Sequence, residues 1–202
     1  MKYNPEKHHR RSIRLPEYDY SKPGGYYITI VTQNRECLFG DVVDGKMILN
    51  DFGRFVQKCW MEIPVIYPHV TLDKFVIMPN HIHGILMIIK NNESVGAIHE
   101  SPLHESPQRN SPLQRRKMTL PKIIGRFKMN TAKYINKMRN SPGIPVWQRN
   151  YWEHVIRDDN DLNRIREYII NNPLQWAMDS ENPELNERTD LKNKNGKQHG
   201  KN

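Results

Sequence analysis

The chain has 202 residues, 37% of them hydrophobic and 26% charged, which suits one globular domain and is too little for two. An excess of 31 Lys and Arg over 22 Asp and Glu gives a formal net charge of +9 and favours a polyanionic partner, either nucleic acid or an anionic membrane surface. No stretch approaches the roughly 18 consecutive apolar residues that span a bilayer, and the first residues lack the apolar centre of a secretory signal, so we expect a soluble intracellular protein.

The first half of the sequence is predicted to be mainly β-structure. Residues 1–24 are rich in Lys and Arg and end at a Pro-Gly turn, which indicates either a basic N-terminal arm or merely a solvated terminus. Alternation of β-branched, aromatic and polar residues then predicts strands at residues 26–32, 37–43, 46–49, 70–78 and 81–89. Asp44-Gly45 is expected to form a hairpin turn. Between the third and fourth strands, Asn50 or Asp51 can cap a helix that ends near Glu62, with Pro64 stopping it.

The second half is predicted to be mainly helical. Residues 91–117 are polar and repeat Ser-Pro, so we expect a flexible insertion there. A helix should begin at Thr119, because apolar residues recur on one face until the chain reaches Pro142. A last strand is expected over 146–156 and a last helix over 158–172, closed by Pro173. Residues 178–202 are polar and are expected to form a disordered tail.

This order of elements predicts an α+β fold, an antiparallel sheet with helices packed against it. A ferredoxin-like arrangement is the simplest closed solution for it. The predicted domain covers residues 25–177, with the insertion inside it.

Two histidines stand out in the strand at residues 81–89. In a strand, side chains two residues apart project from the same face, so His81 and His83 should lie side by side near the start of that strand. Two neighbouring imidazoles form half of a metal site. An equally ordinary interpretation is one satisfied core histidine and one exposed histidine.

Tyr168 and Asn172 form a second pair, because residues four apart lie on one face of a helix. Among the nine tyrosines, only Tyr168 has a carboxamide side chain four residues later. A phenol beside an amide oxygen offers a nucleophile next to a third metal ligand. Alternatively, Tyr168 is simply a half-buried aromatic of an amphipathic helix.

Two strings make these pairs specific: VIMPNHIHGIL at residues 76–86 and WQRNYWEHVIRDDNDLNRIREYIINNPLQW at residues 147–176. Together they closely resemble the REP-associated tyrosine transposases, which are single-tyrosine HUH endonucleases related to the single-strand transposases of insertion sequences. The resemblance covers roughly residues 20–177. It implies that His81, His83 and Asn172 bind a divalent cation and that Tyr168 attacks DNA. It further implies a bacterial cytoplasmic protein that associates with the nucleoid and acts on single-stranded or hairpin DNA in transposition.

The implied chemistry is physically consistent. A phenol has an unperturbed pKa of about 10 and is therefore protonated at neutral pH, so attack on an anionic phosphodiester needs help from a cation. Mg²⁺ or Mn²⁺ is expected here, and the two nitrogen ligands shift the intrinsic preference towards Mn²⁺. The resemblance implies a 5′-phosphotyrosine intermediate and a free 3′-hydroxyl, a polarity that the residues alone do not give.

A DNA track is predicted between Ser106 and Trp152, where eleven Lys or Arg occur and no Asp or Glu. The expected phosphate contacts are Lys122, Arg126, Lys133 and Lys137, with Gln148 and Arg149 as hydrogen-bonding partners. The rings of Trp147, Tyr151 and Trp152 can stack on unpaired bases or can equally anchor the core. His154 has no assigned role.

Two other functions remain open. A relaxase or replication-initiator nickase would share the site, although the YIINNP helix disfavours it. A non-catalytic nucleic-acid-binding module would use the histidines structurally. The sequence does not decide between a monomer and a homodimer.

Overall fold

A computed structural model describes residues 18–89 and 118–185 of the chain. The basic arm up to residue 17, the insertion at 91–117 and the tail from residue 186 lie outside the described residues. The strands are β1 (Gly24–Val31), β2 (Gly40–Val43), β3 (Lys46–Leu49), β4 (Val70–Ile77), β5 (His81–Ile88) and β6 (Trp152–Ile156). The helices are α1 (Asp51–Met61), α2 (Ile63–Ile66), α4 (Thr119–Met138) and α5 (Asp159–Gln175), with 3₁₀ turns η1 (Gln33–Arg35) and η2 (Trp176–Met178).

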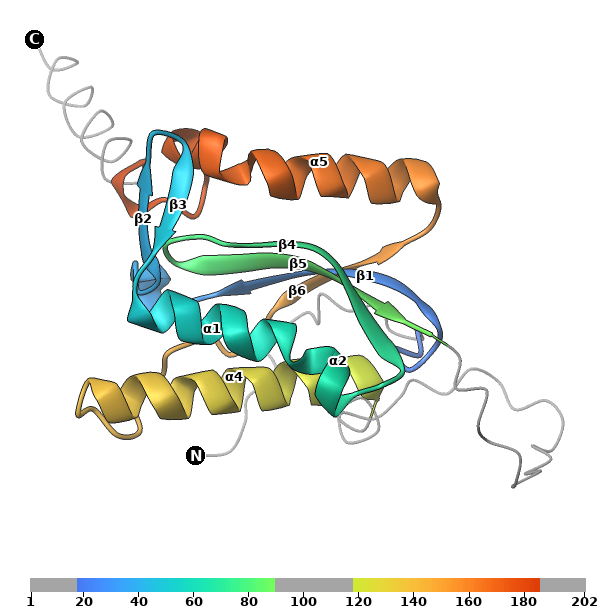
Figure 1. The fold of residues 1–202 in the computed structure, drawn as a ribbon, viewed down its shortest axis with the longest axis horizontal. Coiled ribbons are helices and arrows are strands. Elements are labelled where there is room, and N and C mark those ends of the chain that lie inside the picture. Colours follow the sequence, from blue (N-terminus) through green and yellow to red (C-terminus); the bar gives the residue numbers. More distant parts are fainter. Residues whose placement is uncertain (1–17, 90–117, 186–202) are drawn as a thin grey trace, which may run out of the picture.

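Four strands form one antiparallel sheet in the order β4-β5-β1-β6 (Figure 1). β1 pairs with β5 along its whole length, from Gly24 opposite Ile88 to Val31 opposite His81, and with β6 on its other side. With α1 and α4 as the two crossovers, this is the split βαβ arrangement of a ferredoxin-like fold. The predicted fold class is confirmed. β2 and β3 form a separate hairpin around the predicted Asp44-Gly45 turn.

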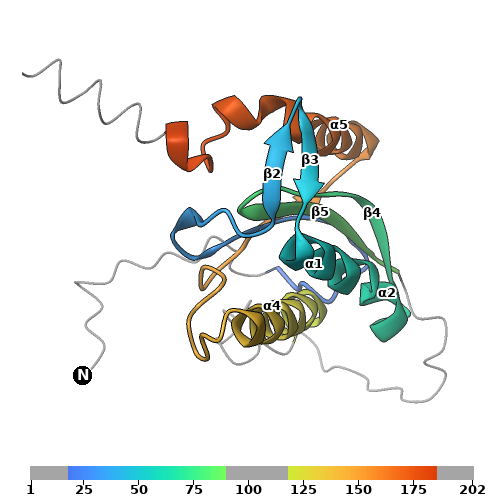
Figure 2. The ribbon, with the colours of Figure 1, turned by 60° about the vertical axis from the view of Figure 1, so that its left-hand side comes forward.

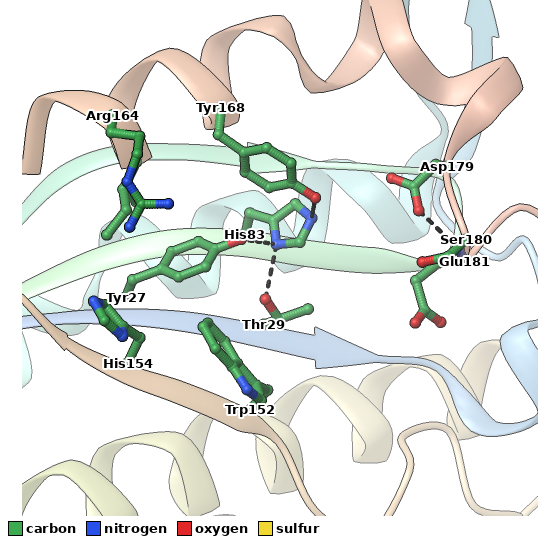
Figure 3. Close-up of a pocket in the computed structure, with 11 residues that line it drawn as sticks. Tyr27, Thr29, His83, Trp152, His154, Arg164, Tyr168, Asp179, Ser180 and Glu181 are labelled. Carbon is green, nitrogen blue, oxygen red and sulfur yellow. Dashed lines mark hydrogen bonds between the residues drawn. The ribbon is translucent and has the colours of Figure 1, made fainter. Parts of the chain in front are cut away.

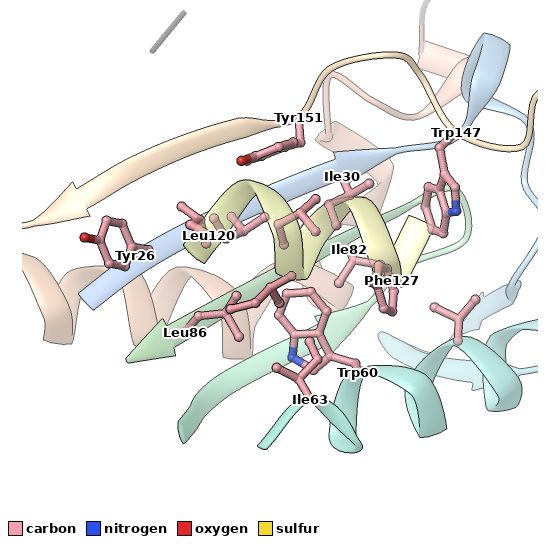
Figure 4. Close-up of a cluster of buried hydrophobic side chains, with 14 of the residues drawn as sticks. Tyr26, Ile30, Trp60, Ile63, Ile82, Leu86, Leu120, Phe127, Trp147 and Tyr151 are labelled. Atoms are coloured by element: carbon pink, nitrogen blue, oxygen red, sulfur yellow. The ribbon is translucent and has the colours of Figure 1, made fainter. Parts of the chain in front are cut away.

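The sheet lies between two layers of helix. Figure 2 shows α1 and α4 side by side on one face and α5 on the other. On the first face, alternate side chains of β1 and β5 join the main core, among them Tyr26, Ile30, Ile82 and Leu86 (Figure 4). The intervening residues face α5, where Tyr27, Ile85, Ile165 and Ile169 form a smaller buried cluster. His81 and His83 follow the second alternation, so they lie on the α5 face of the sheet.

Capping explains where two helices begin. The Asn50 side chain accepts a hydrogen bond from the Gly53 amide at 3.0 Å and starts α1. Asp158 does the same for α5, accepting from the Asp161 amide at 2.8 Å. Pro64 ends neither helix, because it occupies the first turn of α2, where its missing N–H is harmless.

Two predicted boundaries were wrong. Pro173 lies inside α5, which continues to Gln175 although the proline has no N–H to donate to the carbonyl four residues earlier. The last strand begins at Trp152 rather than at residue 146, although Trp147 makes an isolated antiparallel bridge to Thr32. Within the described part of the chain, no helix has the length and apolar character needed to traverse a bilayer.

The glycine after the two histidines has a packing role. A Cβ built on Gly84 would lie 2.4 Å from Cζ2 of Trp60, which is fully buried against this point of β5. Gly84→Ala is therefore expected to lower the free energy of unfolding by about 1–3 kcal/mol, because the core must shift to admit one methyl group. Urea unfolding monitored by circular dichroism measures this loss.

Gly125→Ala is the matched control, since a Cβ there meets nothing within 4 Å on exposed α4. That change should raise the free energy of unfolding by about 0.5–1 kcal/mol. Equal effects of the two substitutions would show that Gly84 is not required by packing.

Candidate metal and nucleophile site

Two buried imidazoles lie next to each other at the start of β5. His81 and His83 are 0% and 4% exposed, and their ring centroids are 4.5 Å apart. The period-2 geometry of the strand brings them together, as the sequence predicted.

Hydrogen bonds orient both rings through Nδ1. Asn80 Nδ2 donates to the carbonyls of Arg35 and Glu181 at 3.0 and 2.7 Å, so Asn80 Oδ1 is the acceptor that receives the His81 Nδ1 proton at 2.8 Å. His83 Nδ1 lies 2.8 Å from the Tyr27 hydroxyl and 2.9 Å from Thr29 Oγ1. For His81 this leaves the Nε2 lone pair for a ligand, and in His83 the bonded Nδ1 leaves Nε2 as the nitrogen that faces Tyr168; metal-binding histidines are commonly held through their other ring nitrogen in this way.

The two imidazoles are held in the neutral form. Burial lowers the pKa of His83 well below its ordinary value, and the neighbouring His81 lowers it further. Burial also lowers the pKa of His81, although Asp179 opposes the effect. Neutral imidazole is the form that binds a metal ion.

Helix α5 brings the second pair to the histidines. The Tyr168 hydroxyl lies 3.5 Å from Nε2 of His83 and the Tyr168 side chain is 43% exposed, whereas Asn172 is 1% exposed. Ile165 and Ile169 pack this helix on the sheet, and Arg166 pairs with Asp73 of β4. Two segments far apart in the sequence therefore meet, an arrangement that the family resemblance implied and that the spacing within each segment does not itself require.

The environment of Tyr168 keeps its phenol protonated. Burial raises the pKa of Tyr168, the carboxylate of Asp179 raises it further, and a hydrogen bond from Asn172 acts in the opposite direction. A bound cation is the natural means to offset this effect.

Asp179 is a site residue that the sequence analysis missed. Its Oδ2 lies 3.9 Å from His81 Nε2, and the ligand atoms of His81, His83 and Asp179 all fall within 4.8 Å of one another. Asn172 Nδ2 also donates to Asp179 Oδ2, at 3.5 Å.

The expected disordered tail therefore starts too early at residue 178. Residues 178–185 are described, and Asn182 Nδ2 donates to the Trp176 carbonyl at 2.9 Å while Arg35 pairs with Glu181 at 2.7 Å. Asp179 also accepts from the Glu181 amide at 2.7 Å, a local turn bond typical of Asp. The turn-forming Asp and Asn residues of this stretch were the signal in the sequence that could have indicated an ordered turn here.

The residues fit a divalent cation. Two buried atoms, His81 Nε2 and Asn172 Oδ1, have no hydrogen-bond partner among the described residues. Because buried polar atoms are nearly always satisfied, two unpaired acceptors facing a carboxylate indicate a missing positive partner. Two nitrogen and two oxygen donors, from His81, His83, Asn172 and Asp179, suit Mn²⁺ and tolerate Mg²⁺.

A cavity of about 440 Å³ opens beside Tyr168 (Figure 3). Its walls come from β1, β5, β6, α5 and the segment after η2. The lining residues are Tyr27, Thr29, His83, Trp152, His154, Arg164, Ile165, Tyr168, Asp179, Ser180 and Glu181.

The predicted DNA contacts lie away from this cavity. Lys122, Arg126, Lys133 and Lys137 are exposed on α4, which covers the opposite face of the sheet. Gln148 and Arg149 lie in the loop before β6 and do not line the cavity.

The three candidate stacking rings differ in their burial. Trp147 and Tyr151 are buried in the main core at 6% and 8% exposure, so the core alternative holds for them. Trp152 is 44% exposed and lines the cavity. Of the three rings, Trp152 alone is placed to meet a base at this site.

One carboxylate at the edge of the cavity should give the fold an acid-sensitive step. A hydrogen bond from His154 at 2.6 Å, with further bonds from Arg164 and the Arg157 amide, lowers the pKa of Asp161 to about 2. In the unfolded chain the Asp pKa is about 3.9, so the stabilisation from Asp161 is complete above that pH and is lost as the pH falls through about 2.

Asp161→Asn should flatten the fall in unfolding free energy between about pH 4 and pH 2, measured by urea unfolding at each pH. Asp158→Ala is unsuitable as a control because Asp158 caps α5, so Asp44→Asn serves instead; a slope unchanged by Asp161→Asn would contradict the assignment.

Comparisons with known proteins bear on the family and the fold. No family model matches the chain. An uncharacterized protein of Haemophilus influenzae is 46% identical over 178 residues, which cover 88% of this chain and 96% of that protein. A second H. influenzae protein, named as a REP-associated tyrosine transposase, is 33% identical over 157 residues, covering 78% of this chain and 74% of its own length. Among solved structures, a REP-associated tyrosine transposase bound to a REP hairpin has the same fold, with a TM-score of 0.50, 16% identity, and coverage of 80% of this chain and 73% of that one.

Proposed function

The chain belongs to the REP-associated tyrosine transposase family, and we propose that it cleaves and rejoins single-stranded or hairpin DNA through metal-assisted attack of Tyr168 on a phosphodiester. One juxtaposition supports this proposal most strongly. The half-exposed Tyr168 hydroxyl lies 3.5 Å from His83 Nε2, beside the unpaired buried atoms His81 Nε2 and Asn172 Oδ1.

Each site residue has a definite role in the proposed reaction. His81, His83 and Asn172 would hold the divalent cation, as the family resemblance implied, and we add Asp179 as a fourth donor on the distances above. When bound, such a cation acts as a Lewis acid on a non-bridging phosphate oxygen. Asn80, Tyr27 and Thr29 orient the two imidazoles through their Nδ1 atoms.

The proposed covalent step is a transesterification. The Tyr168 oxygen forms a bond to the phosphorus, the bond from phosphorus to the 3′-oxygen breaks, the phenol proton is released to solvent, and the 3′-oxygen takes up a proton. The product is a 5′-phosphotyrosine and a free 3′-hydroxyl, the polarity of the family. Because the phosphotyrosine retains the energy of the original ester, a 3′-hydroxyl can later reverse the step and join strands without ATP.

Charge and comparison support a DNA partner. The formal net charge is +9, and the solved relative with this fold is bound to a REP hairpin. We propose that Lys122, Arg126, Lys133 and Lys137 contact phosphates of the duplex part, with Gln148 and Arg149 nearby in the chain, while the unpaired part reaches Tyr168 on the other face.

Detection of a covalent adduct tests the proposed function. The full chain is incubated with palindromic hairpin DNA that carries single-stranded flanks, in Mn²⁺ or in EDTA, and is then denatured in SDS. We expect a protein–DNA adduct in Mn²⁺ and none in EDTA. Failure across varied hairpins, with DNA binding retained, would favour the non-catalytic binding module.

A further inference from the structure

We propose that the cavity beside Tyr168 holds one unpaired nucleotide next to the scissile phosphate, with its base stacked on Trp152 and its own phosphate on Arg164. This inference rests on the proposed function, since it places the nucleotide relative to the bond that Tyr168 attacks. It assigns two residues that neither the metal site nor the nucleophile requires.

Trp152 is an exposed ring where a buried one would be expected. It is 44% exposed on β6, whereas Trp60 and Trp147 are 0% and 6% exposed in the core. An exposed indole in the wall of a cavity is a ready platform for a base, and such stacking contributes about 1–3 kcal/mol per base.

The neighbours of Trp152 hold its ring in place before any ligand arrives. The His154 ring, two residues along the same strand, lies parallel to it within 5° at a centroid distance of 6.0 Å. His154 is itself fixed by Asp161, with Nε2 2.6 Å from Oδ2. The Tyr27 ring meets Trp152 edge-on at 5.3 Å. A rigid platform loses little conformational entropy on binding.

The platform lies close to the nucleophile. The Tyr27 ring stands between the two, with its centroid 5.3 Å from that of Trp152 and 6.3 Å from that of Tyr168. The cavity of about 440 Å³ lies within the range of about 300–1,000 Å³ typical of ligand pockets. Apart from the nucleophile Tyr168, the most exposed ring that lines the cavity is that of Trp152, so the cavity suits a base taken out of a duplex or a base that was never paired.

Charge is unevenly distributed around the cavity. Figure 3 shows Arg164 at one end and Asp179 with Glu181 at the other, with Tyr168 between them. Arg164 Nη2 donates to Asp161 Oδ1 at 2.6 Å, and its side chain is 73% exposed. A guanidinium has five N–H donors, so the bond to Asp161 leaves others for a phosphate. That phosphate would lie at the Arg164 end of the cavity, away from Asp179 and Glu181.

The test compares two single-stranded probes of equal charge. One is a thymidine hexanucleotide, and the other is a hexanucleotide of the same length in which every base is replaced by an abasic tetrahydrofuran. Binding is measured by fluorescence anisotropy on the full chain carrying Tyr168→Phe, so that no covalent adduct forms. The parent should bind the thymidine probe about tenfold more tightly than the abasic probe.

Substitutions at Trp152 decide the assignment. Trp152→Leu should bring the two affinities close together, while Trp152→Phe, which keeps a ring, should preserve most of the difference. Circular dichroism confirms that each variant is folded. No base preference in the parent, or an unchanged preference in Trp152→Leu, would overturn the proposal, and an adduct formed by the wild type under the conditions above would show that the proposed function stands regardless.

Arg164 is tested through salt dependence. Arg164→Gln should weaken both probes alike and reduce the slope of log affinity against log salt by about one. Arg54→Gln removes an equal charge from exposed α1 and should leave the slope unchanged. Equal slopes for these two variants would remove Arg164 from the site.

Discussion

Tyr168→Phe is expected to abolish the covalent protein–DNA adduct and strand cleavage, with a loss of at least about a thousandfold, while divalent-metal binding and the fold are retained. The substitution deletes one oxygen from a ring that is 43% exposed, so packing hardly changes. SDS gel analysis of the adduct and calorimetric titration with Mn²⁺ measure the two properties separately.

Tyr27→Phe is the matched control, because Tyr27 is the other phenol near His83. Its hydroxyl lies 2.8 Å from His83 Nδ1, but the residue is only 7% exposed, and it meets the imidazole at the nitrogen that does not face Tyr168. Burial also raises the pKa of Tyr27 strongly. Tyr27→Phe should keep the adduct, at a reduced rate if the orientation of His83 matters. An adduct that survives in Tyr168→Phe and disappears in Tyr27→Phe would show that Tyr27, and not Tyr168, is the nucleophile.

His81→Ala and His83→Ala are each expected to reduce Mn²⁺ affinity and cleavage by at least about a hundredfold, and to leave DNA affinity nearly unchanged. The first effect follows because each substitution removes a buried nitrogen ligand: His81 Nε2 has no hydrogen-bond partner among the described residues, and His83 Nε2 lies 3.5 Å from the Tyr168 hydroxyl. The second follows because neutral imidazoles release no counterions from DNA. Calorimetry with Mn²⁺ and electrophoretic shift with hairpin DNA measure the two affinities.

His69→Ala provides the control for these substitutions. His69 precedes β4 and lies outside the metal site, so its removal should alter neither Mn²⁺ affinity nor cleavage. If His81→Ala or His83→Ala lowered DNA affinity as much as cleavage, the two histidines would be structural or DNA-contacting residues rather than metal ligands.

The fold and half of the site were accessible from local patterns. Period-2 alternation identifies the strands of the sheet and also places His81 and His83 on one face. Helical spacing places Tyr168 and Asn172 together on α5. These rules depend only on the strand or helix that contains the residues, so they hold however the rest of the chain packs.

Tertiary contacts decided the features that local patterns missed. Asp179 is held at the site by bonds of its neighbour Glu181 to Asn80 and Arg35, and the turn-forming residues of this segment do not reveal these contacts with distant parts of the chain. The basic residues of α4 are exposed as expected, but periodicity does not say on which face of the sheet a helix packs. Trp147 is buried and Trp152 is exposed on the edge strand β6, and the sequence around the two residues does not reveal this difference in burial.

The connection after β5 leaves the sheet at the end of that strand opposite to His81 and His83. His81 and His83 open that strand, and Ile88 closes it seven residues later, which corresponds to roughly 23 Å of extended chain. Residues between there and α4 are thus joined to the framework at a point where changes in loop length do not propagate to the histidines. A change in the length of this connection should therefore leave the positions of His81 and His83 unaltered.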